Sequence, residues 1–248
     1  MNVRTCKPGN HRFIEGVFQY SGGVAALDGY EIVRAQFRQV VPLAEGFRVI
    51  DGHLRAADRP RTALCACELR SPAPFSEAGF RTFNEGYVGR LADWGIVVDG
   101  LNPVARTNVC PANEPPEEPV FHAFCYTRPA ASPTASFVIS GSGEAPEGHS
   151  NYRDHIVRRD DTSSEGLREK VQYVLHAMEC RLSALGGGWK DTTHTQVYTV
   201  HDIYPLLASD LVKSGAARRG FTWHFDRPPV EGLDYEMDCR STASEVFI

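Results

Sequence analysis

Apolar residues recur with helical spacing in two stretches of the chain. In each set the positions step by four, three and four residues, which places them along one stripe of an amphipathic helix. The two sets are Leu43, Phe47, Ile50 and Leu54, and Leu167, Val171, Val174 and Met178. The second set is also punctuated, because Thr162 and Glu165 fit a capping box and Gly186 follows as a stop signal. The pattern predicts one long helix in each half of the chain.

The segments around these helices repeat in the same order. An aromatic residue, two further residues and Ser-Gly occur at "FQYSGG" from Phe18 and at "FVISGS" from Phe137, and each predicts a strand that ends in a tight turn. A strand, a second helix and two closing strands then follow each long helix. The predicted ranges are 62–69, 75–95, 105–111 and 120–127 in the first half, and 193–200, 204–215, 218–225 and 233–242 in the second.

This duplicated order predicts an α+β fold with two tandem domains. In each domain a mixed sheet has two helices packed on one face. Residues 128–136 are rich in Pro, Ala and Ser, which is typical of a linker. We therefore expect an N-terminal domain at 1–129 and a C-terminal domain at 130–248.

Composition narrows the class of protein. The net charge of −5 and the lack of a long basic run argue against nucleic acid as a partner. The apolar runs are too short for a membrane span, and the N-terminus lacks the apolar core of a secretory signal. Seven cysteines, none in a Cys-x-x-Cys pair, favour buried thiols in a reducing cytoplasm. His194 and His201 are too scattered from the cysteines for a zinc site, so no metal is expected.

The ordered motifs resemble the RidA family, also called YjgF or UK114. The carrying residues are the early Ser-Gly turn, "FRTFNEGY" with Asn84 and Tyr87, and "PVARTNV" with Arg106. The resemblance covers nearly the whole chain, twice. It implies a fold similar to chorismate mutase of the trimeric barrel type, ligand pockets at subunit interfaces, and activity as an enamine/imine deaminase. It further implies a homotrimer or a larger homo-oligomer.

The two halves depart from the family pattern in opposite ways. In the second half "AARRGF" offers two arginines, and Arg219 is preferred because Asp234 follows it by fifteen residues, as Phe121 follows Arg106. The first half therefore has Phe121 where the family places an acid. The second half keeps Asp234 and Glu236 but has no asparagine in its shorter helix. Neither half alone carries the full set, which favours a composite site.

The resemblance implies roles for particular residues. Arg106 and Asn84 are expected to hold a substrate carboxylate, because a guanidinium binds a carboxylate through two parallel hydrogen bonds. Glu236 or Asp234 is expected to transfer protons and activate water. Further substrate contacts are predicted for Arg219, Ser21, Gly22, Ser140, Gly141, Asn108 and His122.

Three functions remain open at this stage. The preferred one is a hydrolytic deaminase, without cofactor, of a small 2-amino unsaturated carboxylate or dicarboxylate such as 2-aminomuconate, in the breakdown of aromatic compounds. The second is a protein of the same fold that binds or senses a small carboxylate without turnover. The third is a chorismatase-like hydrolase, which also resembles two fused domains of this fold but is usually longer.

Overall fold

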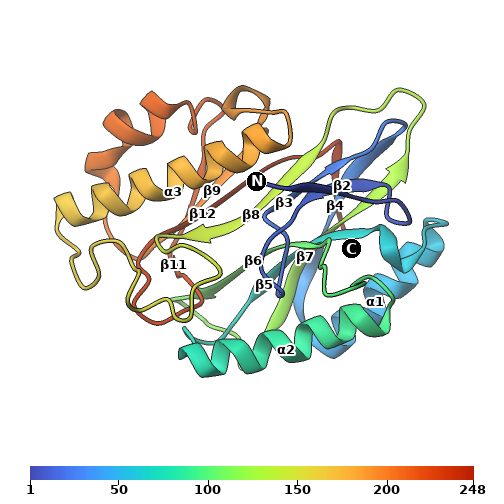
Figure 1. The fold of residues 1–248 in the computed structure, drawn as a ribbon, viewed down its shortest axis with the longest axis horizontal. Coiled ribbons are helices and arrows are strands. Elements are labelled where there is room, and N and C mark those ends of the chain that lie inside the picture. The colour runs from blue at the N-terminus through green and yellow to red at the C-terminus, as the bar shows by residue number, and fades with distance from the viewer.

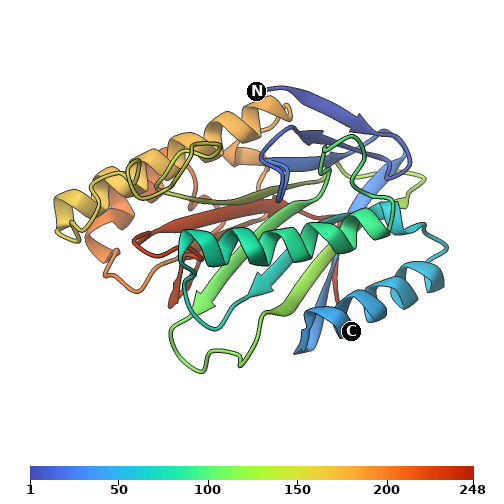
Figure 2. The same cartoon turned by 60° about the horizontal axis from the view of Figure 1, so that its bottom comes forward.

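The computed structural model describes all residues 1–248 and contains two mixed β-sheets between layers of helices (Figure 1). Helices α1 (Leu43–Ala56) and α2 (Glu77–Asp93) lie on one side of the strands. Helix α3 (Ser164–Ala184) lies on the other side, and the turned view of Figure 2 shows the same separation. The long helices predicted at 43–54 and 167–178 are thus confirmed.

One sheet has six strands in the order β11-β6-β5-β7-β4-β13. Helices α1 and α2 cover it through a core that includes Phe47, Leu54 and Leu91. Its strands are β4 (Tyr30–Pro42), β5 (Leu64–Arg70), β6 (Ala105–Pro111), β7 (Val120–Pro129), β11 (Asp226–Arg227) and β13 (Ser244–Phe247).

The other sheet has seven strands in the order β1-β2-β3-β8-β12-β9-β10. Helix α3 covers it through a core that includes Val171, Met178 and Met237. Its strands are β1 (Val3–Cys6), β2 (His11–Ile14), β3 (Gly23–Ala26), β8 (Phe137–Gly143), β9 (His194–Tyr198), β10 (Thr222–His224) and β12 (Glu236–Ser241).

Four strands of each sheet repeat one topology, as the sequence predicted. The order β6-β5-β7-β4 in one sheet matches β10-β9-β12-β8 in the other. In both sets the first pair is parallel and the other two pairs are antiparallel. Strand β4 leads directly into α1, and β8 leads through a longer connection into α3. The predicted α+β fold with two tandem repeats is therefore confirmed.

The predicted strand end at Phe18 is wrong. Residues 18–22 form a turn and an isolated bridge between Ser21 and Ala105, and the strand equivalent to β8 is β4. The Ser-Gly motif does not mark equivalent strands in the two halves. The equivalent strands are the ones that precede the long helices, β4 before α1 and β8 before α3. "FQYSGG" does not lead into a helix.

The second helix predicted in the C-terminal half also differs from the structure. Residues 204–215 contain a short 3₁₀ turn (Tyr204–Leu206) and a π-helical segment (Leu207–Val212) instead of a regular α-helix. Pro205 lies in the first turn of this segment, where its missing amide proton breaks no helical hydrogen bond. The two halves therefore carry unequal helical layers.

Strand pairing crosses the expected boundary between 1–129 and 130–248. Strands β1 to β3 come from the first half, but β3 pairs with β8 of the second. Conversely, β13 and β11 come from the second half and pair with β4 and β6 of the first. Residues 131–135, within the stretch expected to be a linker, are exposed.

Local signals explain the ends of α3. Ser163 caps its N-terminus by accepting a hydrogen bond from the Gly166 amide, one residue later than the predicted capping box. Gly186 follows its C-terminus with a φ of +84°, a conformation that glycine adopts without steric cost.

The cysteines and the helices add two further facts. All seven cysteines are free, and five of them are buried, as expected for packed thiols. No helix of the chain has both the length and the apolar character that crossing a bilayer requires.

Candidate active site

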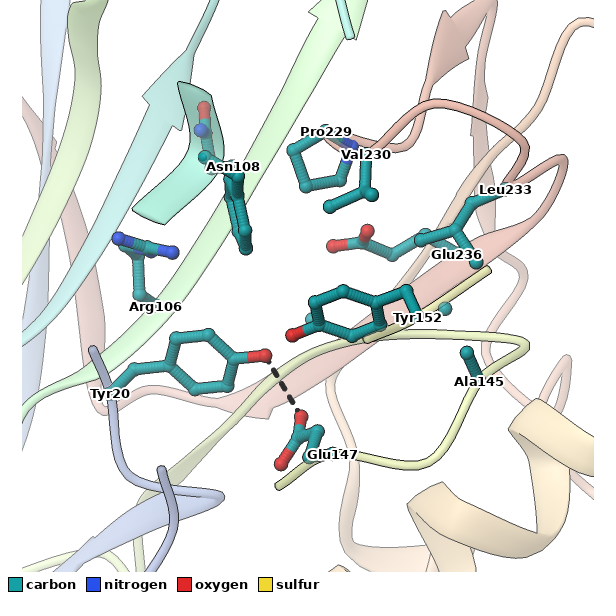
Figure 3. A pocket seen from close by; sticks show the side chains of 13 residues that line it. Tyr20, Arg106, Asn108, Ala145, Glu147, Tyr152, Pro229, Val230, Leu233 and Glu236 are labelled. Carbon is teal, nitrogen blue, oxygen red and sulfur yellow. Dashed lines mark hydrogen bonds between the residues drawn. The ribbon is translucent and has the colours of Figure 1, made fainter. Parts of the chain in front are cut away.

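A pocket of about 430 Å³, including its open mouth, lies where the two repeats meet. Strand β6 and helix α2 supply one wall, while strands β8 and β12 and the loop before β12 supply the other. Figure 3 shows Arg106 on one side of the pocket and Glu236 on the opposite side. The lining residues are Tyr20, Phe80, Arg106, Asn108, Gly141, Gly143, Ala145, Glu147, Tyr152, Pro229, Val230, Leu233 and Glu236.

Arg106 is a buried cation, with 3% of its surface exposed. Its amide donates to Ser140 Oγ (3.0 Å), and that hydroxyl donates to the Ser21 carbonyl (2.6 Å). The first bond joins β6 to β8 and the second joins β8 to the segment at Ser21, and together they hold the backbone from which the guanidinium extends. The Arg106 Nη1 atom donates to Asn84 Oδ1 at 2.5 Å. Asn84 therefore orients Arg106, and it lines an adjoining cavity rather than the main pocket.

Glu236 is the acid that faces this pocket. It is 4% exposed, and burial raises the pKa of its carboxyl well above its usual range, with a further rise from the charge of Asp238. Arg106 acts in the opposite direction but does not reverse the shift. A raised pKa favours the protonated form of the carboxyl, which is able to donate a proton.

Gly141 provides the space in which the Glu236 carboxyl lies. A Cβ on Gly141 would come within 2.1 Å of Glu236 Oε1. Because Gly141 is part of β8 and Glu236 begins β12, the pairing of these strands sets the position of the acid.

Asn108 also lines the pocket and has hydrogen-bonding capacity to spare. Its Oδ1 accepts a hydrogen bond from Ser71 Oγ at 3.0 Å, which fixes the side-chain orientation. Its Nδ2 is buried and has no partner within the chain. A buried donor without a partner is costly, so a carboxylate or carbonyl oxygen of a ligand would satisfy it.

The backbone around the pocket is held by hydrogen bonds of three predicted residues, Ser21, Gly22 and Ser140. The Gly22 carbonyl accepts from the Ser140 amide, and the Ser21 amide donates to the Val104 carbonyl. None of these three residues lines the pocket, whereas the predicted Gly141 does.

Three other predicted residues lie away from the pocket lining. Asp234 forms an ion pair with buried Lys170 (2.5 Å) and contacts His201. Arg219 lies in an exposed turn ahead of β10. His122 is half-buried on β7, where burial lowers the pKa of its imidazole to about 3. Of the two predicted acids, only Glu236 shares the pocket with Arg106.

The sequence interpretation missed the aromatic and acidic residues that complete the pocket. Tyr20 donates to Glu147 Oε1 (2.9 Å), a contact drawn in Figure 3, and Arg181 donates to the same oxygen at 2.7 Å. Tyr152 belongs to the same connection between β8 and α3, and its amide donates to Glu77 Oε1 of helix α2. Phe80 precedes Asn84 by four residues on α2, a spacing that indicates one helix face.

The fold and the pocket together define a class: an α+β protein of two tandem repeats, with a buried arginine and a buried acid facing one polar pocket between them. The chain belongs to the family described as 2-aminomuconate deaminase CnbZ, whose sequence model matches residues 3–246. The resemblance expected from the motifs is thus confirmed. A 2-amino-5-chloromuconate deaminase from Comamonas testosteroni is 49% identical over 243 residues, which cover 97% of this chain and 97% of the relative.

Solved structures that resemble this chain match about half of it. A YjgF/YER057c/UK114 family member from Mycobacterium tuberculosis is 15% identical and covers 47% of this chain and 83% of its own, with a TM-score of 0.31. The YjgF gene product of E. coli is 12% identical and covers 46% and 91%, with a TM-score of 0.30.

Proposed function

We propose that the protein is a hydrolytic deaminase that releases ammonia from a 2-aminomuconate or a substituted 2-aminomuconate during the breakdown of aromatic compounds. The observation that carries this proposal is the placement of Arg106 and Glu236 on opposite sides of one pocket within a single chain. Membership of the aminomuconate deaminase family supports the choice of substrate.

Arg106 and Asn108 supply the binding groups. The guanidinium would donate two hydrogen bonds to the substrate carboxylate next to the amino-bearing carbon, since its planar fork of donors matches a carboxylate. The free Nδ2 of Asn108 would donate to the same end of the substrate. Binding at this end leaves the carbon chain to extend toward Glu236 across the pocket.

Glu236 would then act twice. In its protonated form it donates a proton to a carbon of the enamine system, which converts the carbon–nitrogen bond into an iminium. The resulting carboxylate takes a proton from a water molecule as that water adds to the iminium carbon. The carbinolamine collapses to a ketone and ammonia. These steps are proton transfers and the addition of water, so no redox cofactor takes part in them.

The test is ammonia release from 2-aminomuconate by the purified protein and by Glu236→Gln. Loss of one general acid–base group typically lowers kcat by about 10²- to 10⁴-fold. We expect a loss of that size, with KM changed little because Arg106 is intact. Glu85→Gln, an exposed acid on α2, is the matched control and should keep the wild-type rate.

A full rate in Glu236→Gln would remove Glu236 from the mechanism. Binding of 2-aminomuconate by calorimetry, with no ammonia from the wild-type protein, would instead favour the carboxylate-binding function over an enzyme.

A further inference from the structure

The guanidinium of Arg106 lies among four aromatic rings. Its Cζ atom is 5.0 Å from the ring centre of Tyr20 and 5.1 Å from that of Tyr87. The rings of Phe80 and Phe83 follow at 5.7 and 5.8 Å. All four distances fall within the range of cation–π contact. The rings pack around the guanidinium and restrict its movement.

Two of these rings also line the pocket. Tyr20 and Phe80 both face the cavity into which a ligand of Arg106 would extend. A carboxylate held by both arms of a guanidinium lies in the guanidinium plane. The carbons next to that carboxylate would therefore continue between the rings that flank the guanidinium.

These rings are held in place by their neighbours. The Tyr20 hydroxyl donates to Glu147, and Glu147 is paired with Arg181 of helix α3, itself buried. Phe80 contacts the ring of Tyr152 nearly edge-on, with ring centres 6.2 Å apart. Figure 3 shows Tyr20 between Arg106 and Glu147, as this chain of contacts requires.

We propose that Tyr20 and Phe80 are specificity-determining residues that admit a planar, conjugated carboxylate and reject a saturated carboxylate of equal length and charge. A conjugated chain keeps its carbons in the carboxylate plane. A saturated chain places hydrogens above and below that plane, where the rings lie, and it also loses more rotational freedom on binding. This inference deepens the proposed function, since it rests on Arg106 as the carboxylate site.

Two six-carbon dicarboxylates test the proposal directly. Muconate is conjugated and planar, adipate is saturated, and neither carries the amino group that reacts. We expect calorimetry to show that the wild-type protein binds muconate at least about tenfold more tightly than adipate. Equal affinities would overturn the proposal.

Variants of Tyr20 and Phe80 test whether these two rings cause the preference for muconate over adipate. Tyr20→Leu and Phe80→Leu replace a flat ring by a branched chain and should reduce the preference for muconate to about threefold or less. Tyr20→Phe removes only the bond to Glu147 and should keep most of the preference. Circular dichroism and thermal melts establish that each variant is folded. A folded Phe80→Leu or Tyr20→Leu that discriminates as the wild type does would contradict the assignment.

Failure of this inference is distinguishable from failure of the proposed function. Ammonia release from 2-aminomuconate combined with equal binding of muconate and adipate would overturn the inference alone. Selective binding of muconate without any ammonia release would overturn the deaminase proposal and support the selection of planar carboxylates by Tyr20 and Phe80.

Discussion

At the residue scale, the absence of a side chain on Gly141 leaves the space that the Glu236 carboxyl occupies. A methyl group on Gly141 would come within 2.1 Å of the end of the Glu236 side chain, which has to move because the backbone on either side is part of a sheet. Gly141→Ala is therefore expected to stay folded while displacing the acid and lowering kcat by about 10²-fold or more. Rates of ammonia release measure this effect.

Gly143 offers the matched control on the same strand. A Cβ there would meet the tip of Leu233 at 3.1 Å, which requires only a small shift of a flexible side chain. Gly143→Ala should therefore lose much less activity than Gly141→Ala. Similar losses in both variants would show that the pocket wall, rather than the position of Glu236, limits the reaction.

The buried Glu236 also predicts how stability depends on pH. Its pKa is raised in the folded protein, whereas in the unfolded chain it titrates near pH 4.3. Above that value the folded state retains a proton that the unfolded state has lost, so stability falls as pH rises until the folded pKa is reached. The decrease is up to about 1.4 kcal/mol per pH unit.

Urea unfolding of the wild type and Glu236→Gln between pH 5 and 8 measures this contribution, because glutamine does not titrate. The stability of the variant relative to the wild type should increase as pH rises from 5 and level off once the folded pKa of Glu236 is passed. Parallel curves would mean that Glu236 titrates normally.

The sequence predicted the pocket residues whose strand or helix position is unambiguous. Arg106 lies inside β6 and Glu236 is the first residue of β12, so their motif positions carried over to the structure. Asp234 was paired with Glu236 by strand alternation, but β12 begins only at Glu236, and Lys170 attracts the Asp234 carboxylate instead. Arg219 was assigned by counting residues, which fails because β10 begins at Thr222, beyond an exposed turn.

At the scale of the element, helix α1 contains two glycines in contrasting surroundings. A Cβ on Gly46 would lie 2.2 Å from the ring of Phe121, which is fully buried beneath the helix. A Cβ on Gly52 would meet nothing within 4 Å. Gly46→Ala should thus destabilise the protein by about 1–3 kcal/mol through overpacking. Gly52→Ala should stabilise it by about 0.5–1 kcal/mol through helix propensity.

Denaturant midpoints of the two variants check this contrast, and each serves as the control for the other. A Gly46→Ala variant that is as stable as the wild type or more stable would show that Phe121 does not pack as described. The same contact explains the departure at this position, since Phe121 stands where the family has an acid and here fills the core against Gly46 and Phe47.

Periodicity predicted the long helices but not the longest strand, β4. Helix α1 has a complete apolar stripe and was identified from it, whereas 204–215 has similar apolar content but forms a 3₁₀ turn and a π segment. Helix α2 was found, but its aromatic face was missed. Aromatic residues at helical spacing normally indicate a core, and here Phe80 and Phe83 surround a buried arginine instead.

At the scale of the whole molecule, the two repeats are joined by exchanged strands. The first half contributes β1 to β3 to the seven-stranded sheet of the second half. The second half contributes β11 and β13 to the six-stranded sheet of the first half. The repeat order was visible in the sequence because it depends on local patterns. The exchange was not, because it depends on pairing between residues as distant as Val33 and Ser244. It follows that the pocket between the repeats is part of one cooperative structure.

We propose that chains associate through their sheet edges into a trimer or a larger assembly. Strands β13 and β10 are edge strands, and exposed apolar side chains lie on or beside them: Phe247 (61%), Phe225 (50%), Trp223 (40%) and Val246 (37%). Unpaired edges with apolar side chains favour pairing with another chain. Light scattering should therefore give a mass of at least three times 27.4 kDa.

Phe247→Asp tests the edge itself, because it places a charge where a neighbouring chain would pack and should lower the measured mass. Tyr204→Asp changes a still more exposed aromatic residue (76% exposed) that lies outside both edge strands, and it should leave the mass unchanged. A monomeric wild type would contradict the association. Equal effects of the two variants would move the contact away from β13. The pocket residues come from a single chain, so activity that survives in a Phe247→Asp monomer is expected and would separate assembly from catalysis.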